Sequence, residues 1–326
     1  MRSLTRAATR LLLVASAFLA VASALADGVV GNTLPGDFPV PLDASLGEPL
    51  LGFGAAGTPT RTPVVFVHGN NDTPFPTACN PYGRVQAFAQ FLADRGYALA
   101  DLWAVGYQGD QCDLSLDPTQ RSGPAHTTSA NVPDVRAFVL AMLRYTGAHQ
   151  VDVVAHSLGS VIVREWLRQH TEEGRFVRRF VAIDGPNHGI INCSPNPLNY
   201  WQDPSLGGFT PASAVCQELG SPTTPFLKRL NKGQEAPGAG KDTLVIRNAD
   251  TSFVYFAKQD GIWAPVPAED SFGQPADFSR SASLKGAREL NLTGQGIWDP
   301  ILLTTHLGIL NSPDTWAATL RFLSER

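Results

Sequence analysis

Residues 151–160 read Val151-Asp152-Val153-Val154-Ala155-His156-Ser157-Leu158-Gly159-Ser160. A β-branched apolar run stops at a small-x-Ser-x-small pentapeptide, and a helical pattern resumes at Val161. This order predicts a strand that delivers Ser157 onto a sharp turn at the start of a helix. Ala155 and Gly159 must be small because Ser157 needs a strained backbone conformation, and bulk there would collide with the neighbouring strand and helix. The pattern therefore favours Ser157 as a nucleophile over a buried structural serine.

Short apolar runs alternate with helical patterns along the rest of the chain. Strands are expected at 63–67, 102–107, 151–155, 176–183, 243–246 and near 289–292, and helices at 85–95, about 131–145, about 160–169 and after Ser312-Pro313-Asp314. Alternation of this kind predicts an α/β fold with a mostly parallel, doubly wound sheet covered by helices on both faces.

The N-terminal 26 residues have the pattern of a signal peptide. Arg2, Arg6 and Arg10 precede an apolar stretch, and Ala24-Leu25-Ala26 supplies a small-x-small cleavage site before Asp27. The apolar stretch is too short to span a bilayer comfortably, and no second candidate follows, so no transmembrane segment is expected. We therefore expect secretion to the periplasm or the medium.

Composition indicates one large domain at 63–326, preceded by a segment at 27–62 that wraps the surface. The chain has 326 residues, of which 43% are hydrophobic, and residues 27–62 are rich in glycine and proline with little periodicity. The formal net charge is −4, and loss of the three leader arginines makes it −7. This acidic balance argues against nucleic acid as a partner, and a monomer is expected.

Four cysteines remain after the leader: Cys79, Cys112, Cys193 and Cys216. An even number in an exported chain predicts two disulfides, for which three connectivities exist. We favour Cys79–Cys112 and Cys193–Cys216 because each pair brackets a loop-rich stretch. A metal site is not expected, since no cysteine or histidine falls at zinc-ligand spacing.

The strand–helix alternation stops between about 187 and 240. This stretch is rich in Pro, Gly, Asn and Ser and is long for a structureless loop. We interpret it as a loop-rich insertion over the active site, as a lid or part of a substrate groove. The alternative is a surface loop unrelated to substrate.

A serine hydroxyl needs a base within hydrogen-bonding reach to act as a nucleophile at neutral pH. When the serine follows a strand in this way, the acid and then the histidine come later in the chain. His306 follows the last expected strand and precedes the C-terminal helix, which makes it the predicted base. His188 is the alternative, while His68 is expected to serve structure, and His126 to lie at the surface or cap a helix.

The acid is expected after a later strand. Asp250 comes just past the run 243–246, where a buried carboxylate would orient the imidazole and stabilise its charged form. Asp260 is the next candidate, followed by Asp270 and Asp299. An ordinary turn-forming aspartate is the structural alternative for Asp250.

Two backbone N–H groups are needed to stabilise the oxyanion of the tetrahedral intermediate. Leu158 follows the nucleophile and supplies the first. The second is expected from Asn70, because His68-Gly69-Asn70 follows the first buried strand.

Four motifs carry a resemblance to a known family: Pro63–Asn70, Val151–Gly159, Asn248–Asp250 and Thr305–Gly308. Together they resemble the class 2 (Bacillus-type) lipases, which have an alanine at the first small position of the serine motif. The length, the Cys79 region and the insertion are similar to an extracellular native poly(3-hydroxybutyrate) depolymerase. The resemblance implies an α/β-hydrolase fold, a triad of Ser157, Asp250 and His306, and Asn70 and Leu158 as oxyanion donors.

These observations predict a secreted serine carboxylic ester hydrolase of lipase or esterase type, with no cofactor and no metal. A lipid substrate is expected first, and a polyester such as a polyhydroxyalkanoate is the alternative. A peptidase or an acyltransferase with the same triad stays open, because a triad does not choose between acceptors. A non-catalytic binding protein is disfavoured, since all three triad residue types occur in order.

Overall fold

The computed structural model describes residues 28–39, 50–70, 72–78, 80, 83–107, 109, 126–190, 193, 211–237, 242–248, 269–278, 280–293 and 305–325. In this part of the chain one sheet has the strand order β1-β3-β2-β4-β5-β6-β7. Its strands are β1 (Leu51–Phe53), β2 (Val64–Val67), β3 (Leu102–Gly106), β4 (Val151–His156), β5 (Val177–Ile183), β6 (Thr243–Asn248) and β7 (Arg288–Leu292). Only the edge strand β1 is antiparallel to its neighbour, so the predicted mostly parallel sheet is confirmed.

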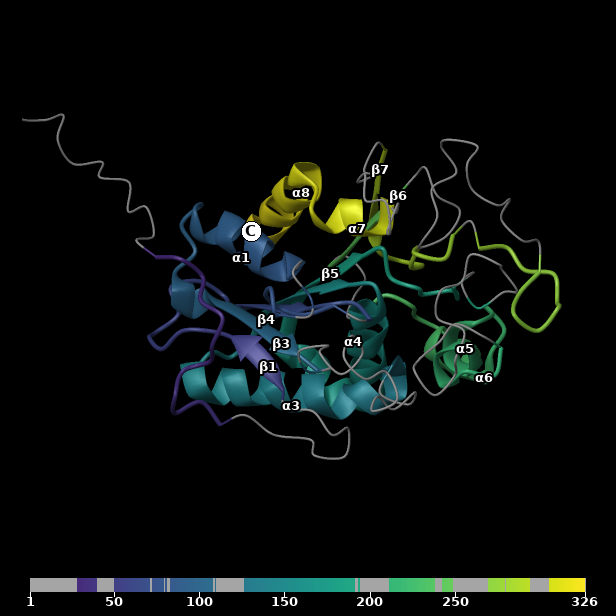
Figure 1. Ribbon diagram of the computed structural model, residues 1–326, viewed down its shortest axis with the longest axis horizontal. Helices are drawn as coiled ribbons and strands as arrows, with labels where there is room; N and C mark the ends of the chain where they lie inside the picture. The colour runs from purple at the N-terminus through teal and green to yellow at the C-terminus, as the bar shows by residue number, and fades with distance from the viewer. Residues whose placement is uncertain are drawn as a thin grey trace, which may run out of the picture.

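Helices cover both faces of the sheet, as the alternation predicted. They are α1 (Arg84–Ala93), η2 (Leu99–Asp101), α3 (Thr128–Thr146), α4 (Leu158–Gln169), η5 (Thr171–Phe176), α5 (Ala214–Leu219), α6 (Pro225–Leu230), α7 (Thr305–Leu310) and α8 (Pro313–Ser324). Figure 1 shows α3 and α4 on one side of the sheet and α1 and α8 on the other. No helix of the described residues has the length and apolar character needed to cross a bilayer.

The central strands are buried on both faces, and most of their residues are apolar. Along β2, Val65 and Val67 pack into the cluster beneath α3 and α4, while Val64 and Phe66 pack into the cluster beneath α1 and α8. This alternation is the two-residue period of a strand, and it places apolar side chains on both faces of the sheet.

The helix predicted to start near Asn131 starts earlier. Thr127 caps α3 by accepting the N–H of Ala130 at 3.1 Å, and Pro133 consequently lies inside the helix. The first N–H groups of α3, on Thr128 and Ser129, donate to the Glu218 carboxylate at 2.7 and 3.3 Å. A carboxylate at a helix N-terminus satisfies donors that the helix itself leaves unpaired. This contact between distant parts of the chain explains why local sequence signals misplaced the start.

The N-terminal segment contributes more than a surface wrap. It supplies β1, a strand that was not predicted from the sequence. Strand β1 pairs with β3. Phe38 is buried, with its ring centroid 5.2 Å from that of Trp103 and 5.5 Å from that of Phe138.

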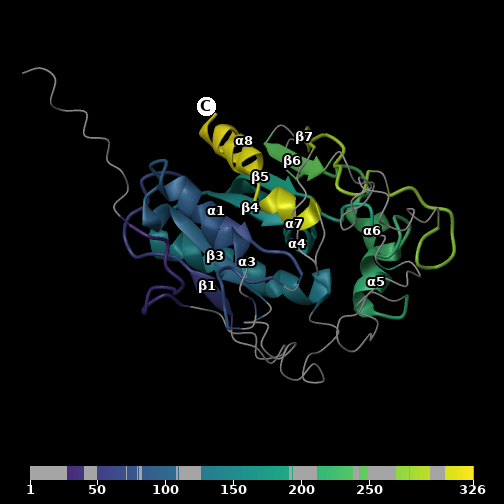
Figure 2. The ribbon, with the colours of Figure 1, turned by 45° about the horizontal axis from the view of Figure 1, so that its top comes forward.

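Within the predicted insertion, residues 211–237 form two short helices, α5 and α6, beside α4 (Figure 2). Two helices of six residues each therefore interrupt the predicted loop-rich insertion. Arg164 of α4 connects α4 to the end of this segment. Its guanidinium donates to Asn231 Oδ1 at 2.6 Å and to the carbonyl of Glu235 at 3.2 Å. It also donates to Asn187 Oδ1 at 3.1 Å.

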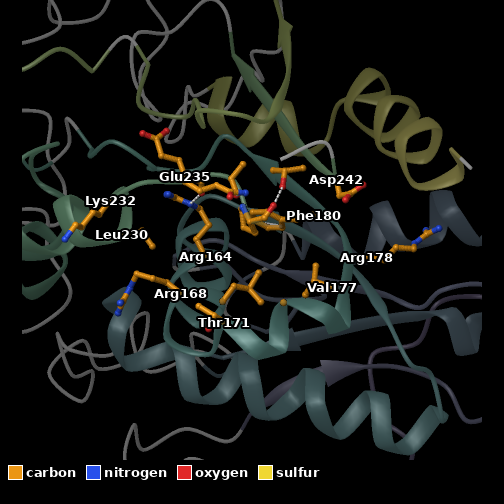
Figure 3. A pocket seen from close by; sticks show the side chains of 16 residues that line it. Arg164, Arg168, Thr171, Val177, Arg178, Phe180, Leu230, Lys232, Glu235 and Asp242 are labelled. Carbon is orange, nitrogen blue, oxygen red and sulfur yellow. Dashed lines mark hydrogen bonds between the residues drawn. The ribbon is translucent and has the colours of Figure 1, made fainter. Parts of the chain in front are cut away.

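Arg164 lines a cavity of about 530 Å³ between α4, the start of β5 and the segment after α6 (Figure 3). The cavity lies at the amino ends of β5 and β6, where Val177, Asp242 and Thr243 line it. The carboxyl ends of these strands are at the opposite edge of the sheet, so the cavity is separate from the site described below.

A disulfide joins Cys193 to Cys216 on α5, with the two Cα atoms 5.5 Å apart. This confirms one of the two predicted pairs. Cys79 and Cys112 lie outside the described residues, as does the predicted leader.

Replacing both Cys193 and Cys216 with alanine is expected to lower the free energy of unfolding by about 3 kcal/mol, because the bridge closes a loop with a sequence separation of 23. Urea denaturation would measure the loss. The Cys79→Ala/Cys112→Ala double variant measures the other predicted pair in the same way. Titration of free thiols at Cys193 and Cys216 in the folded protein would contradict the prediction.

Candidate active site

The carboxyl ends of four neighbouring parallel strands meet at one edge of the sheet. Ser157 follows β4 and Asp184 follows β5, and the register pairs His156 with Ile183 directly before them. The N–H of Ser157 donates to the carbonyl of Ile183 at 2.9 Å. The ends of β2 and β6 flank this pair. In open α/β sheets this edge, near the point where strand order reverses between β2 and β4, is where ligands bind.

Ser157 stands on the strand–turn–helix predicted from its motif. Its φ of 53° and ψ of −128° are strained for a residue with a side chain, and strain of this kind is concentrated at functional sites. Gly159 permits the turn, since a Cβ there would lie 2.4 Å from the carbonyl oxygen of His68. A Cβ at Gly69 would lie 2.8 Å from Cβ and 3.3 Å from Oγ of Ser157. The glycines therefore let the loop after β2 close onto the serine.

His306 lies next to this turn. It is the second residue of α7 and is buried. Its ring centroid is 4.4 Å from that of His156, the residue before Ser157. Strand β4 and helix α7, about 150 residues apart, are thus brought into contact at the predicted nucleophile and base.

Among the described residues, the carboxylate of Asp184 contacts His306. Nδ1 of His306 lies 2.8 Å from Asp184 Oδ2, and Asn248 Nδ2 donates to the same oxygen at 3.1 Å. Asp184 has a φ of 48°, so its backbone conformation is strained, as that of Ser157 is. Asp250, the acid expected from the sequence, lies outside the described residues, as do Asp260 and Asp299. Asp270 accepts backbone N–H groups of Phe272 and Gln274 and serves a turn.

Burial controls the ionisation of this pair. It raises the pKa of Asp184 to about 7, against the opposing influence of His156 and a hydrogen bond from Asn248. Burial also lowers the pKa of His306 to about 3, and nearby Arg84 acts in the same direction. A neutral imidazole can accept a proton, which is the state that a general base requires.

Side-chain contacts fix the loop after β2. Tyr107 donates its hydroxyl to the carbonyl of His68 at 2.8 Å and stacks on the His68 ring with centroids 4.2 Å apart. His68 Nδ1 in turn donates to the carbonyl of Gly69 at 2.7 Å. Asn70 Oδ1 accepts from Nδ1 of His126 at 2.8 Å. The backbone of residues 68–70 is thereby held in one conformation beside Ser157.

Sequence reasoning missed His126 and Asp184. His126 is fully buried against Asn70, whereas a surface or capping position was expected. An aspartate directly after the strand 177–183 was visible in the sequence, and its position one strand from Ser157 was the available signal. The alternative base is His188, and its Nε2 instead lies 3.3 Å from Glu235 Oε2.

One group of potential metal ligands occurs in the described part of the chain: His170, Glu172 and Glu173. Glu173 already accepts hydrogen bonds from Arg136 of α3 and Trp166 of α4. This carboxylate therefore serves helix packing, and we assign no metal to the group.

Comparison with known proteins identifies the family. The family described as "Lipase (class 2)" matches residues 61–268. The chain belongs to the class 2 lipase family. No curated protein matches the sequence significantly.

Solved structures are similar to this class 2 lipase in fold. The mature lipase BlEst2 of Bacillus licheniformis aligns with a TM-score of 0.51 and 16% identity, over 85% of this chain and 98% of that one. Lipase B of Aspergillus fumigatus aligns with a TM-score of 0.48 and 19% identity, over 92% of this chain. This chain spans 62% of the Aspergillus protein. The fold is that of the α/β-hydrolases, and the family makes the protein a carboxylic ester hydrolase.

Gly69→Ala is expected to lower kcat/KM for an ester by about tenfold or more, because the added Cβ would press on Ser157 and His156. Overpacking of this kind costs about 1–3 kcal/mol. Gly31→Ala is the matched control, since a Cβ there meets nothing within 4 Å. Equal activity of the two variants would show that the approach of residue 69 to Ser157 is not required.

Proposed function

We propose that this class 2 lipase is a secreted serine hydrolase that cleaves carboxylic esters through an acyl-enzyme on Ser157. His306 is the general base and Asp184 its carboxylate partner. The observation that carries the proposal is the cluster at the sheet edge: a strained serine, with a neutral buried histidine beside it that is hydrogen-bonded to a buried carboxylate at 2.8 Å.

In the first half of the reaction, Nε2 of His306 accepts the proton of the Ser157 hydroxyl as Oγ attacks the ester carbonyl. The carbonyl oxygen becomes an oxyanion, and the backbone N–H groups of Leu158 and Asn70 donate to it. Leu158 is the first residue of α4, so its N–H has no acceptor within the helix. The protonated His306 then gives its proton to the leaving alcohol.

In the second half, His306 accepts a proton from water, whose oxygen attacks the acyl carbon. Collapse of the second intermediate breaks the bond to Oγ, and the serine regains its proton. Asp184 holds the imidazole through Nδ1 in both halves and stabilises its positive charge.

Secretion is supported by the predicted leader at 1–26 and by the Cys193–Cys216 bridge, because disulfides persist in oxidising compartments. Lipid esters are the proposed substrates, and a polyester is the alternative. Ester hydrolysis on emulsified triglyceride and on amorphous polyhydroxyalkanoate granules, side by side, would separate the two.

Ser157→Ala is expected to abolish hydrolysis of p-nitrophenyl esters while leaving the melting temperature nearly unchanged. Asp184→Asn and Asp250→Asn form a matched pair for the acid. We expect Asp184→Asn to lower kcat by about a thousandfold or more, as loss of a triad carboxylate does, and Asp250→Asn to do far less. The reverse order would assign the acid to Asp250, as the family resemblance implies.

The pH dependence follows from the raised pKa of Asp184. As pH falls through about 7, the carboxyl gains a proton and no longer accepts the Nδ1 proton of His306. The quantity kcat/KM is therefore expected to rise with pH through a limb near 7. Asp184→Asn removes the titrating group, so its residual activity should be flat there; a limb that persists would belong to another group.

A further inference from the structure

His156 is the residue before the nucleophile, and its side chain lies between two parts of the site. It ends β4 and is 2% exposed. A Cβ at Gly69 would lie 3.1 Å from its Nδ1, so one edge of the ring faces the loop after β2. The other edge faces His306, whose ring is tilted by 32° against it.

The contact with His306 determines which nitrogen of His156 carries the proton. Nε2 of His156 lies 3.1 Å from the backbone carbonyl oxygen of His306. A carbonyl only accepts hydrogen bonds, so Nε2 must be the donor. Nδ1 is buried and has no hydrogen-bond partner among the described residues, consistent with a nitrogen that carries no proton.

The surroundings keep the His156 ring neutral. Burial lowers its pKa to about 3, and His306 acts in the same direction, while Asp72 and Asp184 act against it. Asp72 is itself balanced by Arg84, with Nη1 and Oδ1 3.8 Å apart. A neutral imidazole has one N–H, and the His306 carbonyl uses it.

The position of His306 depends on such contacts because α7 is a short helix. Ile309 and Leu310 anchor its far end in the core beneath α1 and α8. At the near end, His306 is held through its ring by Asp184 and through its backbone by His156. Since His156 and Ser157 are consecutive, the second contact ties the base directly to the nucleophile.

We propose that His156 is a positioning residue for the ester hydrolase: its Nε2–H tautomer holds the backbone of His306 at the distance from Ser157 that proton transfer requires. The inference rests on the proposed function of Ser157 and His306. It does not give His156 a proton to transfer. A displacement of about 1 Å in such a site can cost on the order of a hundredfold in rate, which gives this contact its importance.

Three variants test the positioning role by kinetics. His156→Leu removes the donor, whereas His156→Gln keeps an N–H at a similar reach. We expect the leucine variant to lower kcat by about tenfold or more with little change in KM, and glutamine to restore most of the loss. His149→Gln, at an exposed position, is the control and should be unchanged. A leucine variant that keeps full kcat, or a glutamine variant that is equally impaired, would overturn the proposal.

Nitrogen-15 NMR of the histidine rings tests the same contact without an ester. In the wild type we expect His156 to be in the neutral Nε2–H form from pH 5 to 9, and the Nδ1 proton of His306 to be protected from exchange. In His156→Leu that protection should fall while the melting temperature confirms a folded protein. A protonated or Nδ1–H form of His156 would overturn the proposal. A wild type that shows the expected signals but hydrolyses no ester would instead count against the proposed function.

Discussion

The site depends on the hydrogen-bonded register between β4 and β5. His156 pairs with Ile183, and the N–H of Ser157 donates to the carbonyl of Ile183, so Ser157 and Asp184 leave the sheet at the same level. The N–H of Asp184 donates in turn to Ile246 of β6 at 2.8 Å. A slip of one residue would turn either side chain to the other face of the sheet. The buried apolar side chains of these strands oppose such a slip on both faces, which is how core packing fixes the geometry of a polar site.

Burial then decides the chemistry that the site can perform. Asp184, His156 and His306 are all buried. Burial raises the pKa of the aspartate and lowers the pKa of both histidines, so it favours the neutral form of each side chain. Two neutral histidines can lie in contact without repulsion, and each has a single N–H whose acceptor fixes the tautomer. The same low polarity strengthens any charge–dipole interaction that forms as an oxyanion develops.

The predicted insertion is connected to the site through α3. Glu218 of α5, two residues after the disulfide-bonded Cys216, accepts the first N–H groups of that helix. His126, just before the helix, holds the side chain of Asn70. Hydrogen bonds therefore link three segments that are far apart in sequence: the loop after β2, the start of α3, and α5. These contacts account for the burial of His126, which was expected at the surface or at a helix cap.

The sequence by itself determined the strand–turn–helix around Ser157 and the mostly parallel sheet, and it favoured the Cys193–Cys216 pair among three connectivities. It also singled out His306. These features follow from local spacing: β-branched runs, small residues around the serine, and proline-containing caps such as Ser312-Pro313 at α8. Only the tertiary structure decided that Asp184 contacts His306, that His126 supports Asn70, and that α3 begins at Thr128. Each of these three depends on a contact across at least 56 positions of the chain, and no pattern within a window of ten or twenty residues carries that information.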